Sequence, residues 1–198
     1  MVFQSLWQLV ADDVCNFIIK AFKGRQNLSE VNYSLIVLIP KVPMPKFIHQ
    51  FRPIGLCNVV FKILTKVIVN RIKPLMIFLV TNNQCRFVPG RHTVDNIIVA
   101  QEVIDSMRNL KRGRKGFMVT KVDLEKACDR LNWDFIRETL VLAGIPRDMV
   151  ALIMACIETN SLSVLWNCIV ADKFLPARGI RQGDSFSPYI FMLCSERL

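Results

Sequence analysis

The sequence predicts an α+β fold, because stretches with the apolar spacing of helices alternate with short apolar runs typical of strands. Its 198 residues are 52% apolar, which is enough material for a sizeable hydrophobic core. No window approaches the roughly 20 uninterrupted apolar residues that a membrane span needs. The first residues, Met1 to Trp7, also lack the pattern of a secretory signal. We therefore expect one main domain in an intracellular, non-secreted protein without a membrane partner.

The same two patterns recur along the chain. Helices are expected up to Gly24 and over residues 59–72, with a buried strand over 34–40 between them. Pro43 and Pro45 exclude a regular helix from the segment that follows this strand. The later elements expected from spacing and caps are a helix over 93–109 capped by Thr93, a strand over 117–123, helices over 134–142 and 147–158, hairpin-like strands over 161–166 and 173–180, and a final helix that Ser187 and Pro188 open.

The charge balance favours a polyanionic partner. Lysine and arginine total 26 against 16 acidic residues, which gives a net charge of +10. Such an excess attracts nucleic acid or an anionic surface. The alternative is that the basic residues only keep an apolar chain in solution, and charge alone does not separate the two.

The cysteines indicate a reducing compartment rather than a metal site. Seven are scattered along the chain, without a Cys-x-x-Cys pair, and only two histidines accompany them. A zinc site therefore has no spacing to support it. We expect most of these cysteines to be small buried hydrophobic residues.

Two segments carry residues suited to chemistry. Asp123 is expected at the exposed end of a strand, where a carboxylate can reach a divalent cation, although such residues more often cap the next helix. The segment from Arg178 to Asp184 contains glycines that let a backbone approach a ligand, just before a helix whose N-terminus favours anionic groups. Each segment alone also fits an ordinary cap or loop.

Taken together, five motifs in order make a specific pattern: Leu38-Ile-Pro-Lys41, Phe51-Arg-Pro-Ile54, Arg86-Phe-Val-Pro-Gly-Arg91, Lys121-Val-Asp-Leu-Glu-Lys-Ala-Cys-Asp-Arg130 and Gly179-Ile-Arg-Gln-Gly-Asp184. This series closely resembles the reverse transcriptase of LINE-type (non-LTR) retrotransposons, particularly the plant branch. The likeness covers essentially the whole chain. It implies the fingers and part of the palm of a right-hand polymerase, with residues 1–116 as a fingers-like region and 117–198 as a partial palm.

The resemblance implies roles around an incoming deoxynucleoside triphosphate. Asp123 matches the first catalytic, metal-binding aspartate of the palm, and the carbonyl of Leu124 would lie beside the same metal. Arg52 matches the fingers arginine that closes on the nucleotide, and Lys41 a nearby lysine that contacts the triphosphate. The remaining nucleotide-binding positions are Cys128, Gln182 and Gly183.

The resemblance further implies an RNA template and a DNA primer as partners, with two Mg²⁺ ions in the complete family enzyme. Arg91 matches a motif between fingers and palm where backbone or template contact is expected. The other cations expected to contact nucleic acid are Lys111, Arg112, Arg114, Lys115 and Arg181.

The sequence departs from the family pattern in ways that put activity in doubt. The second carboxylate motif, an aromatic-Ala-Asp-Asp hairpin, does not occur and is expected beyond Leu198, so we expect a truncated chain. One aspartate cannot hold two Mg²⁺ ions about 4 Å apart. Cys128 stands where the family has tyrosine or phenylalanine, under the nucleotide sugar. Ser185 and Phe186 replace the usual Pro-Leu.

The sequence therefore predicts a fragment of an RNA-directed DNA polymerase that is inactive as this chain. Whether it is an enzyme stays open, since the family is a nucleotidyltransferase but one carboxylate motif is missing. A non-catalytic nucleic-acid-binding remnant is the alternative. A relative of intron maturases, which share the polymerase motifs but act in splicing, is a third and weaker reading.

Overall fold

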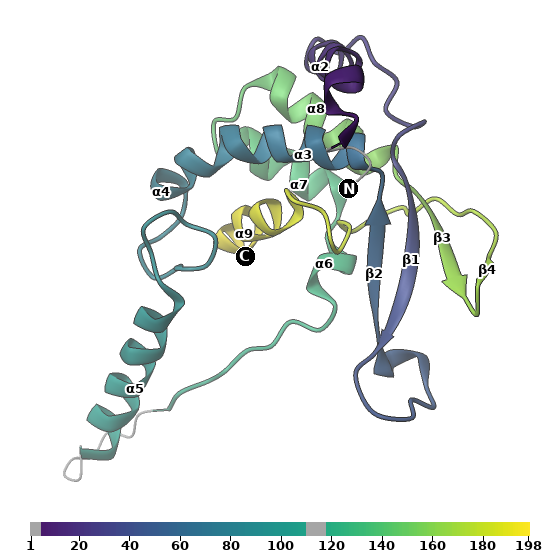
Figure 1. Cartoon of the computed structure of the whole chain (residues 1–198). Helices are drawn as coiled ribbons and strands as arrows, with labels where there is room; N and C mark the ends of the chain where they lie inside the picture. Colours follow the sequence, from purple (N-terminus) through teal and green to yellow (C-terminus); the bar gives the residue numbers. More distant parts are fainter. Residues whose placement is uncertain (1–4, 110–117) are drawn as a thin grey trace.

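The computed structural model describes residues 5–109 and 118–198, which form a group of helices beside a small mixed sheet (Figure 1). The fold is therefore α+β, as predicted. In chain order the elements are α2 (Trp7–Phe22), β1 (Tyr33–Pro40), η1 (Ile48–Gln50), β2 (Phe51–Cys57), α3 (Val59–Ile72), η2 (Lys73–Leu75), α4 (Met76–Leu79), α5 (Thr93–Asn109), α6 (Ala127–Arg130), α7 (Trp133–Leu142), α8 (Arg147–Glu158), β3 (Ser161–Trp166), β4 (Ile169–Val170) and α9 (Ser187–Arg197).

The sheet has the strand order β2-β1-β3-β4. β1 and β2 form an antiparallel hairpin whose register runs from Ser34 opposite Cys57 to Pro40 opposite Phe51. β3 pairs with β1 in parallel, and β4 with β3 antiparallel. The parallel pair joins strands from both sides of the predicted boundary between residues 116 and 117, which itself stays a prediction.

The core lies among the helices, with α3 at its centre. Phe61, Leu64 and Ile68 on α3 are fully buried, and they share one apolar cluster with Leu140 of α7 and Ile190 of α9. Burying each such side chain contributes about 1.5–3 kcal/mol relative to leaving it exposed. The apolar side of α3 thus holds the other helices and the sheet in one unit.

Local caps explain where the core helices begin. The side chain of Asn58 accepts a hydrogen bond from the Val60 amide at 2.9 Å, at the start of α3. Asn132 does the same for the Asp134 amide at 2.7 Å, at the start of α7. Each cap satisfies a backbone donor that has no partner inside its helix. Gly24, with φ +65°, follows α2 as predicted.

Most of the predicted elements are confirmed, in particular α3, α5, α8 and β3 with the predicted bounds. Two predicted caps are wrong. Thr93 is the first residue of α5, and the carboxylate of Asp95 instead accepts a hydrogen bond from the His92 amide at 3.3 Å. Ser187 is the first residue of α9, and its buried hydroxyl has no hydrogen-bond partner among the described residues.

Two predicted strands are also wrong. Residues 173–180 contribute only an isolated bridge between Phe174 and Leu162, and the strand that pairs with β3 is the short β4. Residues 118–123 are not in a strand. A strand needs a partner edge for its backbone groups, and the sheet of the described residues does not include this segment.

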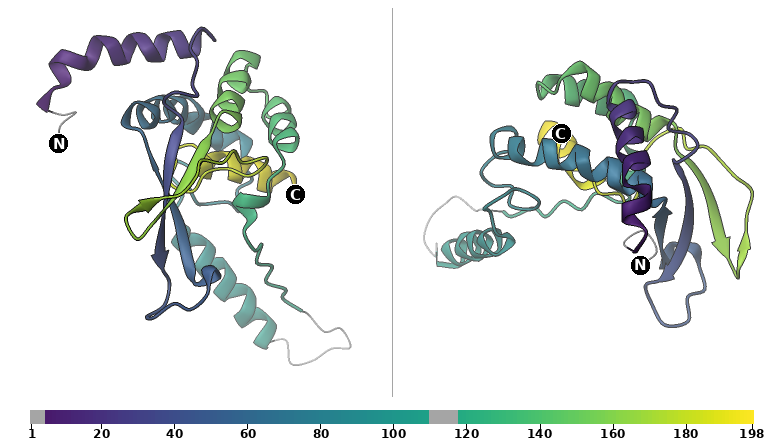
Figure 2. Two further views of the ribbon diagram at one scale, coloured as in Figure 1. Left: turned by 90° about the vertical axis from the view of Figure 1, so that its right-hand side faces the viewer. Right: turned by 45° about the horizontal axis from the view of Figure 1, so that its top comes forward.

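α5 and the segment after residue 117 extend away from the helical core (Figure 2). α5 has no buried residue, and its apolar side chains, among them Ile97 and Val99, are about half exposed. Met118 and Val122 are 87% and 75% exposed. Among residues 5–109 and 118–198, no helix has both the length and the apolar character to cross a membrane.

Candidate functional site

The loop over residues 178–184 is fixed between the free edge of β2 and the helix α6. The Gly55 amide of β2 donates to the Gln182 carbonyl at 3.1 Å. On the other side, the Gly179 amide donates to the Leu131 carbonyl at 2.7 Å, and the Ile180 amide to the Cys128 carbonyl at 2.9 Å. Backbone hydrogen bonds on both sides therefore set the position of this loop, which we call the glycine loop.

Two glycines make this close docking possible. Gly179 has φ +84°, and a Cβ atom there would lie 2.7 Å from the carbonyl oxygen of Asp129. Gly183 has φ +103°, and its Cβ would lie 3.0 Å from the carbonyl oxygen of Gly55. Both positions combine a left-handed backbone with no room for a side chain, so only glycine fits without strain.

The glycine loop brings three of the predicted nucleotide-binding residues together. Cys128, Gln182 and Gly183 line one pocket of about 480 Å³, whose other walls come from Phe87 and from Phe191 of α9. The aromatic Phe87 lies within the motif at residues 86–91 but was not among the predicted site residues. Its position within that motif could therefore have identified Phe87 as a site residue.

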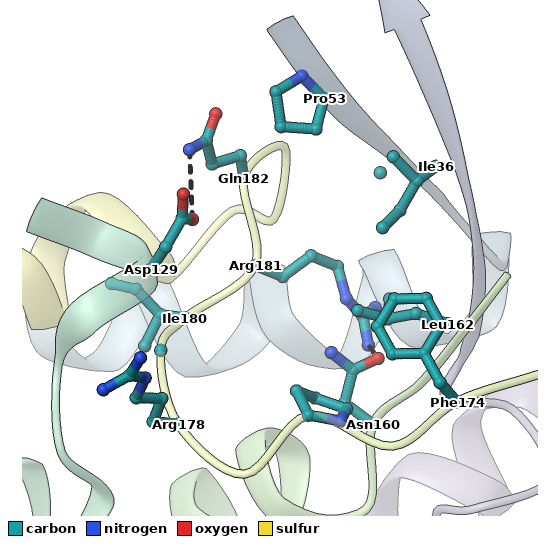
Figure 3. Close-up of a pocket in the computed structure, with 13 residues that line it drawn as sticks. Ile36, Pro53, Asp129, Asn160, Leu162, Phe174, Arg178, Ile180, Arg181 and Gln182 are labelled. Carbon is teal, nitrogen blue, oxygen red and sulfur yellow. Dashed lines mark hydrogen bonds between the residues drawn. The ribbon is translucent and has the colours of Figure 1, made fainter. Parts of the chain in front are cut away.

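Gln182 also faces a second, smaller cavity of about 260 Å³ (Figure 3). Its side-chain amide donates to the carboxylate of Asp129 at 3.3 Å, so the exposed end of Gln182 is held toward α6. Pro53 and Gly55 of β2 form the opposite wall. Asp129, another residue missed by sequence reasoning, thus orients a predicted nucleotide contact.

Cys128 lies half-buried beside this arrangement. Burial raises the pKa of its thiol, and the negative charge of Asp129 raises it further. The thiol is therefore neutral at pH 7. Its chemistry in the pocket is that of a small apolar side chain, not of a nucleophile.

Arg181, which is predicted to contact nucleic acid, directs its side chain into the protein in the described structure, and the contact with nucleic acid stays a prediction. The guanidinium donates to the side chains of Asn32, at 2.5 Å, and of Asn160, and to the Cys57 sulfur at 3.2 Å. Its charge also lies 4.9 Å from the centre of the Phe61 ring. Arg181 therefore ties the glycine loop to the residues that precede β1 and β3. No pattern in the sequence singled out the two asparagines.

Arg91, the other described residue predicted to contact nucleic acid, also bonds within the chain. Its guanidinium donates to the backbone carbonyls of Thr81, at 2.5 Å, and of Gln84, at 2.8 Å, and to the Asn82 side chain at 3.3 Å. These bonds close the loop between α4 and α5. Arg91 therefore holds this loop together, and its predicted contact with template stays a prediction.

Asp184, at the end of the glycine loop, is a buried carboxylate that the sequence did not flag. It is 5% exposed, and burial raises its pKa. Hydrogen bonds from the Thr65 side chain and the Ser185 amide, together with the positive charges of Arg181 and Lys62, partly offset this rise. The carboxylate thus keeps specific partners at the beginning of α9.

The predicted metal ligand Asp123 lies apart from the glycine loop. It is exposed, and it lines a different pocket, of about 550 Å³, together with Leu124, Glu125 and Arg130. Within the described ranges, no group of three or more His, Cys, Asp or Glu side chains is close enough to hold a metal ion. Two catalytic cations need several oxygen ligands. The described residues therefore do not fit a two-metal site.

Lys41 and Arg52 lie on the hairpin of β1 and β2. The Lys41 ammonium donates to the His49 carbonyl at 3.1 Å, and Arg52 is exposed opposite Ile39. Neither lines the two pockets that contain Gln182. Arg52 lies three residues before Gly55, about 10 Å along the strand. The predicted cluster of Lys111, Arg112, Arg114 and Lys115 falls outside the described residues.

The α+β fold agrees with the comparisons to known proteins. The family described as Reverse transcriptase (RNA-dependent DNA polymerase) matches residues 39–198. The chain is 28% identical over 162 residues to the Retrovirus-related Pol polyprotein from type-2 retrotransposable element R2DM of Drosophila melanogaster, a match that covers 82% of this chain and 15% of that protein. The Transposon TX1 uncharacterized 149 kDa protein of Xenopus laevis is 25% identical over 194 residues, which is 98% of this chain and 15% of that protein.

A third relative, the Retrovirus-related Pol polyprotein from type-1 retrotransposable element R2 of Nasonia vitripennis, is 29% identical over 159 residues, 80% of this chain and 15% of that protein. The chain belongs to the reverse transcriptase family. Within it, the chain is a reverse transcriptase domain of the non-LTR retrotransposon type, as predicted, while membership of the plant branch stays a prediction. It spans about 15% of the length of these curated relatives.

Proposed function

We propose that this chain forms the nucleotide-receiving part of an RNA-directed DNA polymerase, which acts on an RNA template annealed to a DNA primer. The observation that carries the proposal is the docking of the glycine loop between β2 and α6. It sets Gln182 and Gly183 in one pocket with Cys128. Because backbone bonds and glycine contacts fix the loop, the pocket is organised before any ligand arrives.

The proposed roles follow the chemistry of each side chain. Arg52 and Lys41 supply the positive charge that a triphosphate requires, and both are exposed on the hairpin. Gln182 and Gly183 pack against the new base pair, and Cys128 lies under the sugar. Asp123 contributes one carboxylate to divalent metal binding, with Mg²⁺ as the proposed ion and the Leu124 carbonyl beside it.

We further propose that the 198 residues alone do not polymerise, because they hold one of the carboxylates that the reaction needs. The family generally uses divalent metal ions, whereas the described residues form no metal cluster. Binding of primer–template is therefore the activity expected of the chain itself. The test is equilibrium binding of a labelled RNA template annealed to a DNA primer. Binding at moderate salt supports the proposal, and its absence in a folded chain contradicts it.

The second candidate function is that of a non-catalytic remnant that only binds nucleic acid. The net charge of +10 favours it, and so does Cys128 at a position where the family has an aromatic residue. The two candidate functions predict different results for primer extension. A polymerase part regains primer extension when fused to a segment with the missing carboxylates, and a remnant does not. An intracellular location is proposed for both, since all seven cysteines are free and nucleic acid is the partner.

A further inference from the structure

A cavity of about 390 Å³ lies beside the turn that connects β1 to β2. Its walls come from three parts of the chain: the turn, the paired ends of β1 and β2, and β3. The side chains that line it include Leu38, Lys46, Phe47, Phe51, Val164 and Trp166. We call it the hairpin cavity.

The hairpin cavity lies on the sheet face opposite Arg52. Residues that pair across neighbouring strands share a face, and alternate residues along a strand point to opposite faces. Phe51 pairs with Pro40, so it shares a face with Leu38, two residues away. Arg52 pairs with Ile39 on the other face. Leu38 pairs with Pro53, so the hairpin cavity lies on the same face as the 260 Å³ cavity that Gln182 faces. It has no lining residue in common with either pocket that contains Gln182.

Its walls present aromatic rings to solvent. Phe51 and Trp166 meet edge to face, with ring centres 5.7 Å apart. Phe47 stacks on His49 with centres 5.6 Å apart and an angle of 9° between the rings. Trp166 is 50% exposed and Phe47 62% exposed, although burying such rings would stabilise the fold. Both therefore keep a free face for a planar ligand.

The turn that carries Phe47 is held in place by one glutamine. The side-chain oxygen of Gln50 accepts hydrogen bonds from the Lys46 amide at 2.6 Å and from the Phe47 amide at 3.0 Å. The Gln50 carbonyl accepts from the Lys41 amide at 2.8 Å. A ligand that enters the hairpin cavity therefore does not have to order the turn first.

The charge around the hairpin cavity favours an anionic ligand. The turn between β1 and β2, residues 41–50, includes Lys41 and Lys46 and no acidic residue. Lys46 is exposed at the rim, and its ammonium makes no hydrogen bond or ion pair among the described residues. Exposed aromatic rings next to cations are the usual means of binding single-stranded nucleic acid, by stacking of bases and attraction of phosphates.

We propose that the hairpin cavity binds one unstacked base of a single-stranded nucleic acid, with Phe47 and Trp166 as stacking surfaces and Lys46 beside the adjoining phosphate. This inference rests on the proposed nucleic-acid partner and adds a binding site outside the nucleotide pocket. An apolar peptide would use the same rings, but the acid-free, basic rim favours the polyanion.

The test compares two labelled 12-residue RNA strands by fluorescence anisotropy with the full chain. One is oligouridine, and the other carries the same phosphates on abasic sugars. Because stacking of one base is worth about 5- to 100-fold in affinity, the chain should prefer oligouridine by that factor. Phe47→Ala and Trp166→Leu should each remove most of this preference and leave the salt dependence unchanged. Lys46→Gln should instead lower the slope of the salt dependence by about 1.

Phe78→Ala is the matched control, since Phe78 is 85% exposed on α4 and lies outside the hairpin cavity. It should bind both strands as the unmodified chain does. Phe47 is an exposed turn residue, so the Phe47→Ala variant should stay folded. It therefore tests the base preference even if Trp166→Leu unfolds the sheet. Full retention of the base preference in a folded Phe47→Ala variant overturns the inference. Equal binding of both strands overturns it too, while no binding of either contradicts the proposed function itself.

Discussion

The backbone amide of Gly55 in β2 donates a hydrogen bond to the carbonyl oxygen of Gln182 at 3.1 Å. This contact joins the sheet to the glycine loop, across 127 positions of the chain. Gly183 follows at once, and its missing side chain leaves room for the Gly55 carbonyl. The pocket of Cys128, Gln182 and Gly183 therefore depends on two backbones that approach closely. We expect its position to change with substitutions that remove no functional group.

Gly179→Ala should lower the free energy of unfolding by about 2–4 kcal/mol, because it adds both left-handed strain and a backbone clash. The new Cβ would lie 2.7 Å from the Asp129 carbonyl oxygen. Gly24→Ala is the control, since Gly24 has φ +65° but nothing within 4 Å of the added atom. Strain alone should then cost about 1–2 kcal/mol. Urea unfolding measures both, and equal costs would show that the contact with Asp129 does not constrain the loop.

The stability of the fold should depend on pH through Asp184. Burial raises its folded pKa above the unfolded value, so the folded state binds more protons between these two pKa values. Its contribution to stability is therefore present below the unfolded pKa and is lost as the pH rises through the folded pKa. Asp184→Asn should remove this loss. Unfolding free energies measured from pH 4 to pH 8 should diverge for the two proteins as the pH rises. Parallel curves would exclude Asp184 as their cause.

Nucleic-acid binding should weaken linearly with salt concentration on logarithmic axes, with a slope set by the phosphates neutralised. Glutamine at positions 112, 114 and 115 should reduce that slope by about 2–3 if these cations contact phosphates. The control places glutamine at three exposed cations near the end of α2, Lys20, Lys23 and Arg25, and removes the same charge. Equal slopes for the two variants would mean that net charge, rather than the cluster at residues 111–115, determines binding.

Cys128 should weaken discrimination between deoxyribonucleotides and ribonucleotides. In the family an aromatic ring at this position leaves no room for a 2′-hydroxyl, and the half-buried thiol here is much smaller. In a chain fused to the missing palm segment of a relative, Cys128→Tyr should lower ribonucleotide incorporation about 10-fold or more. Deoxynucleotide incorporation should change little. If the fusion with Cys128 and its Cys128→Tyr variant discriminate equally, the side chain at position 128 does not exclude the 2′-hydroxyl.

Much of the fold could be predicted from the sequence, because local patterns determine it. The helix over 59–72 has a continuous apolar side, a capping asparagine and a central place in the core, so periodicity alone indicated it. The strand expected over 117–123 failed for the opposite reason. Its β-branched residues favour an extended chain, but a strand also needs a neighbouring edge, which no local pattern supplies.

In the candidate site, too, local motifs could be predicted from the sequence and long-range contacts could not. Gln182 and Gly183 could be predicted as site residues because glycines and a motif mark the loop. Arg181 was expected at nucleic acid from the resemblance, and its contacts within the chain were not predicted. Its actual partners, Asn32 and Asn160, lie 149 and 21 positions away and come together only after β1 and β3 pair. Long-range polar networks of this kind have no sequence signature.

The central claim, that this pocket serves RNA-directed DNA synthesis, is tested most directly by primer extension. The 198-residue chain should extend no primer on an RNA template with Mg²⁺, since the described residues form no group of three or more His, Cys, Asp or Glu side chains that could hold a metal ion. Fused to a relative's segment that carries the aromatic-Ala-Asp-Asp motif, it should extend the primer, and Asp123→Ala should abolish extension while binding of primer–template persists. A folded fusion that binds primer–template but extends nothing, or that extends equally well with Asp123→Ala, would contradict the claim.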